Sequence, residues 1–254
     1  MKRIILLLLM FSSLAVYAQK TDLSTVNTVK PKKGQKMAFE AAYKVHIAKF
    51  HKASENINVY EIMSGPYAGQ YHLVNGGRSY ADFDKERADA TAHSQDLDKT
   101  FFPYLEETMN ATFRFIDSMS LRPEVVADKY VVTVRHMNPS LNLDDYRKEW
   151  VRTVAVQKEL KSGFNENLSY ATFEQLWDGS DQVIVSIRNL KDGFKSLEMN
   201  YFGATPPGSP NFRDVYSKKY GNTAWDNRVK VMDKATDKTE AYIMRLRKDL
   251  SSQQ

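Results

Sequence analysis

The stretch NVYEIMSGPYAGQYHLV, residues Asn58–Val74, organises the first half of the chain because two strand-like runs flank a turn. Runs rich in β-branched and aromatic residues on both sides of a glycine-containing loop predict a β-hairpin. Pro66 fixes its own φ angle, whereas Gly65 and Gly69 permit positive φ, which suits a loop between paired strands. A phosphate-binding loop is the alternative, but a helix would then follow, with its N-terminus facing the anion. The residues that follow, QYHLV, read as a strand, so the hairpin is favoured.

Around this hairpin, the first half of the chain reads as strand, helix, strand, strand, helix, strand. The first strand has one weak candidate, LSTVNTVKP (Leu23–Pro31), and MAFEAAYKVHIAKF (Met37–Phe50) carries the apolar stripe of a helix. After the hairpin we expect a polar helical connection, a helix over Thr100–Ala111 and a closing strand in TFRFIDSMSLRPE.

The second half repeats this order. KYVVTVRHM (Lys129–Met137) is the clearest strand of the chain, and LDDYRKEWVRTVAVQKEL predicts a helix. Two strands, NLSYATFEQLW and DQVIVSIRNL, are joined through Asp178 and Gly179, a good hairpin signal. A helix around Trp225–Lys238 and a last strand, EAYIMRLRKDL, complete the half. The Pro-rich stretch Asn200–Asn222 predicts either a binding loop or a stiff surface connection.

The two halves can be laid on each other with small loop insertions. The matched positions are Tyr43 with Trp150, Tyr60 with Tyr170, and Phe83 with Phe194. Each half then reads β-α-β-β-α-β, the ferredoxin-like unit, although two unrelated α+β halves would share some of this order by chance. We therefore predict an α+β fold of two tandem ferredoxin-like units, over residues 19–127 and 128–254.

The segments FEAAYKVHIAKFHKA, VYEIMSGPYAGQYHLV and RSYADFD resemble the dimeric α+β barrel superfamily, which includes antibiotic-biosynthesis monooxygenases and NIPSNAP-like proteins. The resemblance is one of element order and covers nearly all of the chain after residue 18. It implies that two ferredoxin-like sheets pack into a barrel, here within one chain, and it carries over no catalytic motif. Haem-binding relatives would need a proximal histidine on a helix of the second unit. No histidine follows His136, so neither haem nor another cofactor is expected.

The first residues, MKRIILLLLMFSSLAVYAQK, have the pattern of a secretory signal peptide. Lys2 and Arg3 precede an apolar run, Ile4–Met10, and Val16-Tyr17-Ala18 then places small or β-branched residues at the cleavage positions. A membrane anchor is the alternative, but the apolar run is too short to cross about 30 Å of hydrocarbon. We predict that residues 1–18 are removed, that the mature chain begins near Gln19, and that it is periplasmic or secreted.

Composition excludes several classes of protein. The chain has no cysteine, which rules out disulfides and thiolate chemistry. Its net charge of +5 falls to +3 without Lys2 and Arg3, and its charges are interleaved, unlike the basic blocks of nucleic-acid-binding proteins. No further apolar stretch is long enough to span a membrane. Phosphate-loop, dinucleotide and serine-hydrolase motifs are also absent from the sequence. A homodimer, if formed, would use surfaces outside the barrel.

The five histidines do not predict a metal site. His46 and His51 lie five residues apart on the predicted helix, about 140° around its axis, so they cannot ligate one metal as an i,i+4 pair would. His46 lies on the aromatic stripe and is interpreted as a core residue, and His93 as an exposed one.

Two histidines fall on strands that line the expected barrel. Alternation places His136 on one face with Val132 and Val134. Either His72 or His136 could point into the barrel beside Glu61, Arg135 or Tyr60 and form an acid–base pair. Trp177, next to a hairpin turn, either packs in the core or stacks on a ligand. The candidate ligand-binding residues are therefore His72, Glu61, Tyr60, His136, Arg135 and Trp177.

Two functions fit these expectations. The first is an exported barrel with a structural role or a small apolar or aromatic ligand, because no catalytic constellation is recognisable. The alternative, which the superfamily resemblance allows, is a cofactor-independent oxygenase or isomerase acting on a small aromatic or apolar substrate. The fold alone does not decide between them. Convergence of buried polar side chains in a cavity, His72 and a carboxylate above all, would favour the enzyme.

Overall fold

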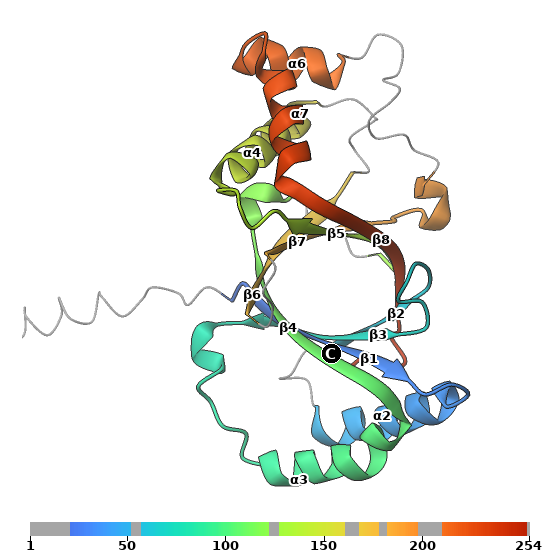
Figure 1. Ribbon diagram of the computed structural model, residues 1–254. Coiled ribbons are helices and arrows are strands. Elements are labelled where there is room, and N and C mark those ends of the chain that lie inside the picture. The colour runs from blue at the N-terminus through green and yellow to red at the C-terminus, as the bar shows by residue number, and fades with distance from the viewer. Residues whose placement is uncertain are drawn as a thin grey trace, which may run out of the picture.

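Eight β-strands close into one barrel among the residues that the computed structural model describes, which are 21–51, 57–121, 127–160, 168–177, 182–197 and 210–252 (Figure 1). The predicted signal peptide lies outside these residues. The strands are β1 (Leu23–Pro31), β2 (Ile57–Ile62), β3 (Tyr71–Arg78), β4 (Leu105–Phe115), β5 (Lys129–Met137), β6 (Tyr170–Trp177), β7 (Val183–Asn189) and β8 (Thr236–Leu246). The α-helices are α2 (Lys36–Phe50), α3 (Ala90–Asp96), α4 (Asp144–Glu159), α6 (Phe212–Tyr220) and α7 (Ala224–Ala235). Short helical turns cover Tyr80–Asp82, Leu97–Phe101, Phe102–Tyr104, Asp117–Met119 and Gly193–Leu197.

The two halves of the barrel have the same strand order. Around the barrel the order is β1-β3-β2-β8-β5-β7-β6-β4, so the halves run β4-β1-β3-β2 and β8-β5-β7-β6. In each half the first strand lies between the third and the fourth, which is the ferredoxin-like arrangement, and all neighbours are antiparallel. The halves meet at two seams, β2–β8 and β4–β6. The predicted fold class is confirmed, whereas the residue limits of the two units stay a prediction.

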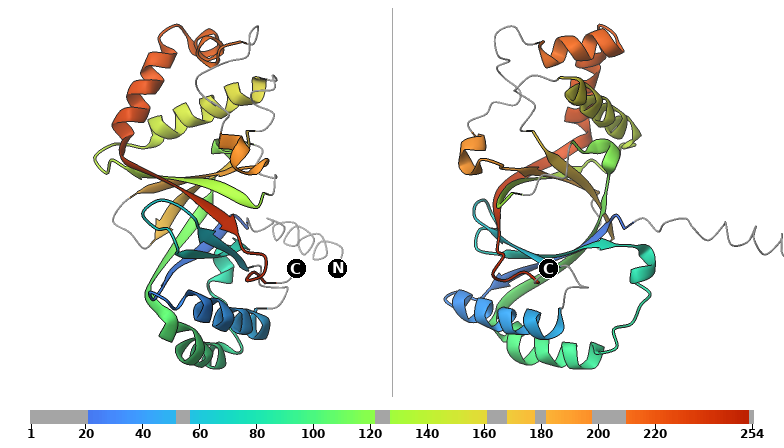
Figure 2. Two further views of the ribbon diagram at one scale, coloured as in Figure 1. Left: turned by 90° about the vertical axis from the view of Figure 1, so that its right-hand side faces the viewer. Right: turned by 180° about the vertical axis from the view of Figure 1, so that it is seen from behind.

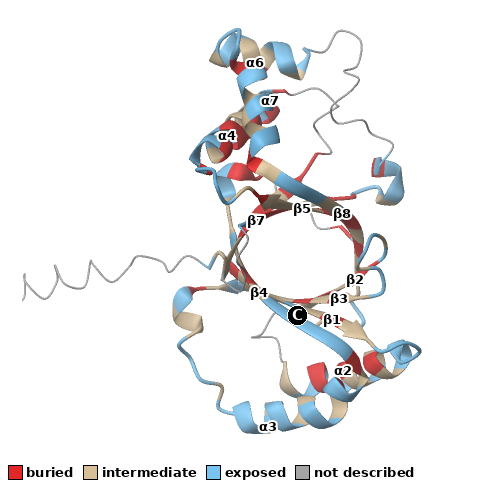
Figure 3. Ribbon diagram, viewed as in Figure 1, coloured by how far each residue is buried: buried red, intermediate tan, exposed pale blue. Residues whose placement is uncertain are grey.

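Helices cover the outside of the barrel on two opposite sides (Figure 2). α2 and α3 lie over the first half, and α4, α6 and α7 over the second. Buried residues occur on the helices as well as on the strands (Figure 3). In α4 they divide between the sheet, where Trp150 packs with Tyr170, and the outer helices, where Val156 packs with Tyr216 of α6. Tyr43 of α2 and Trp150 of α4 are both buried, as their positions on the predicted stripes require. None of the helices in the described ranges combines the length and the apolar character needed to cross a bilayer.

An apolar cluster fills the inside of the barrel. Apart from Ala127, which precedes β5, its buried members lie on strands, because alternate side chains of each strand point inward. Its buried members are Ile62, Ala127, Tyr130, Val132, Val183, Val185, Tyr242 and Met244.

The opening hairpin forms as predicted, and its loop also contacts the second half. β2 and β3 pair as antiparallel strands, and Gly65 and Gly69 have φ angles of 83° and 86°. A Cβ atom on Gly65 would lie 3.0 Å from the Cβ of Tyr242 and 3.2 Å from the carbonyl oxygen of Ala241 in β8. The Ser64 hydroxyl accepts a hydrogen bond from the backbone N–H of Ile243 at 2.9 Å. Glycine at position 65 thus permits the turn and the close approach of the two halves.

Three expectations from the sequence are corrected. The helix predicted over Thr100–Ala111 is wrong beyond Tyr104, because Leu105–Phe115 is a strand that pairs along all of β1. Pairing with β1 outweighs the helical preference of the Leu-Glu-Glu run. Within the expected loop Asn200–Asn222, residues 212–220 form α6, while 200–209 lie outside the described residues.

The predicted match of Tyr60 with Tyr170 is also wrong. Tyr60 packs inside the barrel, whereas the hydroxyl of Tyr170 donates to Gln157 of α4 on the outside. The equivalent positions are Glu61 and Glu174, which face an arginine of the neighbouring strand at the two seams.

Candidate functional site

His72 lies inside the barrel in a short polar chain. Its Nδ1 is 2.9 Å from the hydroxyl of Thr28, and its Nε2 is 2.8 Å from the hydroxyl of Tyr242. Tyr60 is its partner across the β2–β3 pair, on the same inner face. Burial lowers the pKa of His72 to about 4, so its imidazole is neutral at physiological pH. His72 is held between two hydroxyl groups and has no carboxylate among these contacts.

A carboxylate joins the second inner histidine instead. Nε2 of His136 is 3.3 Å from Oε2 of Glu240, and the hydroxyl of Tyr67 donates to the same oxygen at 3.3 Å. Lys238 holds the other oxygen of Glu240 at 2.7 Å and lowers the pKa of this carboxyl group, with a further contribution from His136. The ring of Tyr67 packs at 5.9 Å from that of Tyr242, which links this group to His72. The arrangement is an imidazole, a carboxylate and a phenol within hydrogen-bond reach.

The predicted grouping of Glu61 and Arg135 with the inner histidines is wrong. Successive residues of a strand face opposite sides, so Glu61 points outward once Tyr60 points inward, and Arg135 once His136 does. Glu61 forms ion pairs with Lys36 and with Arg245, at 2.6 Å for the latter.

Arg135 lies beneath α4. Its guanidinium is 4.7 Å from the centre of the Trp150 ring and donates to Ser186 at 3.0 Å. Burial lowers the pKa of Arg135. Trp177 ends β6, opposite Thr112 of β4, and its side chain lies outside the described residues.

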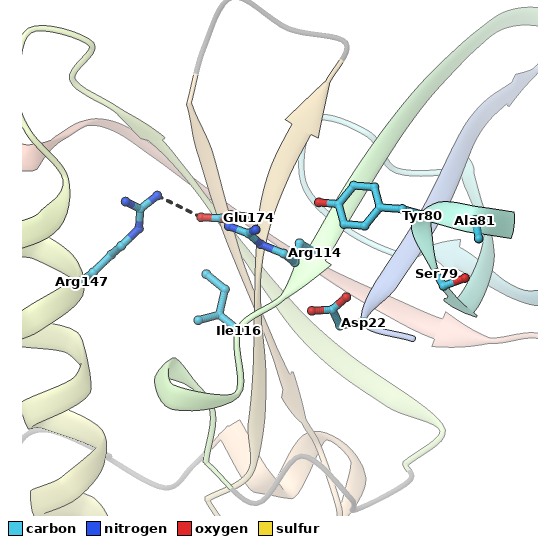
Figure 4. A pocket seen from close by; sticks show the side chains of 8 residues that line it. All are labelled: Asp22, Ser79, Tyr80, Ala81, Arg114, Ile116, Arg147 and Glu174. Atoms are coloured by element: carbon cyan, nitrogen blue, oxygen red, sulfur yellow. Dashed lines mark hydrogen bonds and ion pairs between the residues drawn. The ribbon is translucent and has the colours of Figure 1, made fainter. Parts of the chain in front are cut away.

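An open pocket of about 680 Å³ lies at the β4–β6 seam (Figure 4). Arg147 reaches it from α4, Tyr80 comes from the turn after β3, and Arg114 and Glu174 lie between them on the paired strands. Asp22, Ser79, Ala81 and Ile116 complete the lining. The pocket therefore draws on both halves of the chain.

The buried carboxylate of Glu174 organises the pocket. Arg147 donates to Oε2 of Glu174 at 3.0 Å, and Arg114 donates to Oε1 from the partner strand. A guanidinium has five N–H donors, so these bonds leave donors on both arginines for a further acceptor. The exposed ring of Tyr80, on the opposite wall, offers an aromatic surface. A small molecule with an aromatic body and an oxygen acceptor fits this combination.

A cluster of three histidines lies outside the barrel, beside α2 and α3. Nε2 of His46 is 3.2 Å from Nε2 of His51 and 3.2 Å from Nε2 of His93, and the last two atoms are 3.1 Å apart. The geometric reason for expecting that His46 and His51 cannot share a metal does not hold. It assumed that the helix continues, whereas α2 ends at Phe50 and His51 leaves it with φ −115° and ψ 80°.

Sequence reasoning missed the residues that complete these sites. Glu240 and Tyr242 lie on the predicted last strand, where alternation places both on one face. Pairing of this strand with the strand of His136 could have indicated that this face is the inner one. Arg114 and Glu174 carried no signal, because only the closure of the barrel makes β4 and β6 neighbours.

The fold is that of the dimeric α+β barrel proteins, here closed by two halves of one chain. No family model matches the chain, and none of the curated proteins compared with it matches either. An anthrone oxidase-like protein of known structure is 11% identical, with a TM-score of 0.55 over 89% of this chain and 92% of that one. A protein from Lactobacillus acidophilus NCFM, provisionally described as a monooxygenase, is 8% identical, with a TM-score of 0.52 over 91% and 96%. A mutant chlorite dismutase from Candidatus Nitrospira defluvii is 6% identical, with a TM-score of 0.50 over 90% and 92%. At these identities the likeness establishes the fold.

Proposed function

We propose that this protein binds a small molecule with an aromatic or apolar body and an anionic or oxygen-acceptor group in the pocket at the β4–β6 seam. The observation that carries the proposal is the convergence of Arg114, Arg147 and Tyr80 on one space of about 680 Å³. Pockets of roughly 300–1,000 Å³ are typical of small-ligand sites. We also propose, from the signal peptide pattern alone, that the protein acts in the periplasm or outside the cell.

The guanidinium donors of the pocket favour an acceptor group on the ligand. Arg114 and Arg147 share the carboxylate of Glu174, and Arg147 also pairs with Asp144 at 3.4 Å, so the pocket has no excess positive charge. What the two guanidinium groups offer a ligand is their remaining N–H donors. Asp22 also lines the pocket and limits the net charge. A ligand with one carboxylate or phenolate oxygen and a ring against Tyr80 fits this balance better than a polyanion does.

The first prediction uses anilinonaphthalene sulfonate, an aromatic anion whose fluorescence rises on binding. We expect one saturable site on the wild-type protein and an affinity at least tenfold lower in Arg147→Ala, because a hydrogen bond to a charged group contributes about 1.5–3 kcal/mol. Tyr80→Ala should weaken binding through the loss of the ring. Fluorescence titration at constant ionic strength measures both effects.

Lys148→Ala is the matched control. It removes the same charge from an exposed position one residue along α4. We expect this variant to bind the dye as the wild-type protein does. Equal affinities of Arg147→Ala and Lys148→Ala would contradict the proposed site, since they would show that binding depends on net charge only.

A second candidate function, a cofactor-independent oxygenase or isomerase, is favoured by the contact of His136 with Glu240. A neutral imidazole oriented by a carboxylate can remove a proton from an activated C–H bond, and such a base contributes about 10²–10⁴-fold to a rate. An electron-rich carbanion of an aromatic substrate could then transfer electrons to oxygen itself. Two of the structures with the same fold are described as an anthrone oxidase-like protein and, provisionally, a monooxygenase.

This alternative predicts oxygen uptake with anthrone as the probe substrate. His136→Ala and Glu240→Gln should each lower the rate by about 10²–10⁴-fold, whereas Lys148→Ala should leave it unchanged. Measurement with an oxygen electrode, with product analysis by chromatography, tests this. If oxygen uptake with the wild-type protein equals the uncatalysed rate, the oxygenase alternative is contradicted and only the binding function remains proposed.

A further inference from the structure

The structure assigns a metal site to His46, His51 and His93, and we propose that it binds one Zn²⁺ through the three Nε2 atoms. The site lies on the outside of the first half, where the C-terminal end of α2 meets α3, away from the barrel interior and from the seam pocket. It is therefore independent of the function proposed above.

The distances between the three nitrogens match a metal-bound set. Zn²⁺ binds imidazole nitrogen at about 2.0–2.1 Å with tetrahedral geometry, which places two ligand atoms roughly 3.3 Å apart. The three Nε2···Nε2 distances are 3.1, 3.2 and 3.2 Å. One ion can therefore lie within bonding distance of all three atoms, with a fourth position left for water or another ligand.

Hydrogen bonding alone does not account for this cluster. Nδ1 of His46 is 2.9 Å from Oδ2 of Asp96, and the carboxylate acceptor places the proton on Nδ1. Nε2 of His46 then has only a lone pair, which can accept one well-aligned hydrogen bond, yet it faces two other Nε2 atoms. With His51 and His93 also protonated on Nδ1, a cation at the centre binds all three Nε2 lone pairs at once.

Asp96 gives the cluster the outer support that zinc-binding histidines commonly have. A carboxylate on the far nitrogen of a ligand histidine fixes its tautomer and its orientation. Asp96 is itself held by Lys49 at 2.7 Å and by the hydroxyl of Thr100 at 3.1 Å. The imidazole of His46 is thus preorganised with Nε2 aimed at the centre of the cluster.

The surroundings combine an apolar floor with access from solvent. His46 is 1% exposed, and the ring of Phe50 packs at 5.1 Å from His46 and 5.2 Å from His93. His51 and His93 are half-buried, so a cation can reach the cluster from outside. A bound ion would join α2 to α3, two elements that are separated in the sequence by the whole hairpin.

The test is a Zn²⁺ titration of the full mature chain, purified without a histidine tag and stripped with a chelator. Competition with a chromophoric chelator gives stoichiometry and affinity, and the visible absorption of Co²⁺ reports tetrahedral ligation. We expect one Zn²⁺ per chain. Asp96→Asn should weaken binding about 10–100-fold with the stoichiometry kept, and His93→Ala or His51→Ala should weaken it further.

His136→Gln is the matched control, since it removes an imidazole outside the cluster, and it should bind Zn²⁺ as the wild-type protein does. Circular dichroism of the metal-free variants checks that each is folded, and His51 and His93 are chosen for substitution because they are not fully buried. Absence of one-to-one binding in the wild-type protein would overturn the proposal. So would an unchanged affinity in His93→Ala.

Discussion

Replacing Trp150 with alanine is expected to lower the free energy of unfolding by about 3–5 kcal/mol, the usual cost of truncating a buried aromatic residue. The indole is 6% exposed, and its Nε1 donates to the carbonyl oxygen of Met119 at 2.9 Å. Its ring also covers the guanidinium of Arg135 at 4.7 Å, and that cation would lose its aromatic partner. Urea denaturation followed by circular dichroism measures the change.

Tyr43→Ala, on the opposite side of the molecule, should lower the free energy of unfolding by the same amount, about 3–5 kcal/mol. Tyr43 is 3% exposed and packs against Phe39 and Phe101, with ring centres 6.1 and 5.3 Å away. Lys44→Ala and Lys148→Ala alter exposed neighbours on the same helices and should stay within about 0.5 kcal/mol of the wild-type protein. Near-wild-type stability of both aromatic variants would contradict the packing of α2 and α4 on their sheets.

These positions show what the sequence could predict. The helical stripes placed Tyr43 and Trp150 on the sheet side, and alternation placed His136 with Val132 and Val134, because each pattern depends only on local geometry. Even the weakest strand, Leu23–Pro31, was found with the bounds that the structure has. The closed barrel was expected from the resemblance of the element order to the dimeric α+β barrel superfamily, and not from these patterns alone.

The sites depend on features that no local pattern contains. His51 lies next to His46 because α2 ends at Phe50, one residue before His51. His93 lies on α3, and the sequence alone does not indicate where this helix packs. The boundary of a helix is the least certain part of such a prediction. Glu61 was assigned to the wrong side because the inward face of β2 was unknown until the register with its neighbours was fixed. One observed contact, His72 with Tyr242, would have settled that face.

Glu61 is expected to stabilise the seam between β2 and β8, and its substitution should have the second large effect on stability. Three residue pairs define that seam, and Glu61 lies opposite Arg245 in the middle one. Its side chain is 10% exposed and is paired with Lys36, Arg245 and Arg247. Glu61→Gln keeps the shape but leaves these cations without their shared carboxylate. We expect a loss of about 2–3 kcal/mol, less than the roughly 3–5 kcal/mol of a fully buried pair, because Lys36 and Arg245 remain half-exposed.

This loss should depend on pH. Burial would raise the pKa of Glu61, but the hydrogen bonds from Lys36 and Arg245 outweigh burial and hold it at about 2. A carboxyl group whose pKa is lower in the folded than in the unfolded state stabilises the fold above the unfolded pKa, near 4.5. That stabilisation is lost as the pH falls from about 4.5 towards 2. Denaturation at pH 7 and at pH values between 4.5 and 3 should show the wild type and Glu61→Gln converging as acid is added.

Glu61 tests the seam more cleanly than its counterpart, Glu174. Both carboxylates face an arginine across a seam, but Glu174 also lines the pocket, so its substitution would change ligand binding and stability together. Glu106→Gln is the control, because Glu106 pairs with Lys30 at an exposed site, where an ion pair contributes about 0–1 kcal/mol. A constant difference between wild type and Glu61→Gln across the acid range would contradict the proposed role of the ionised carboxylate. In that case packing, and not the charge of Glu61, would explain how β2 and β8 stay paired.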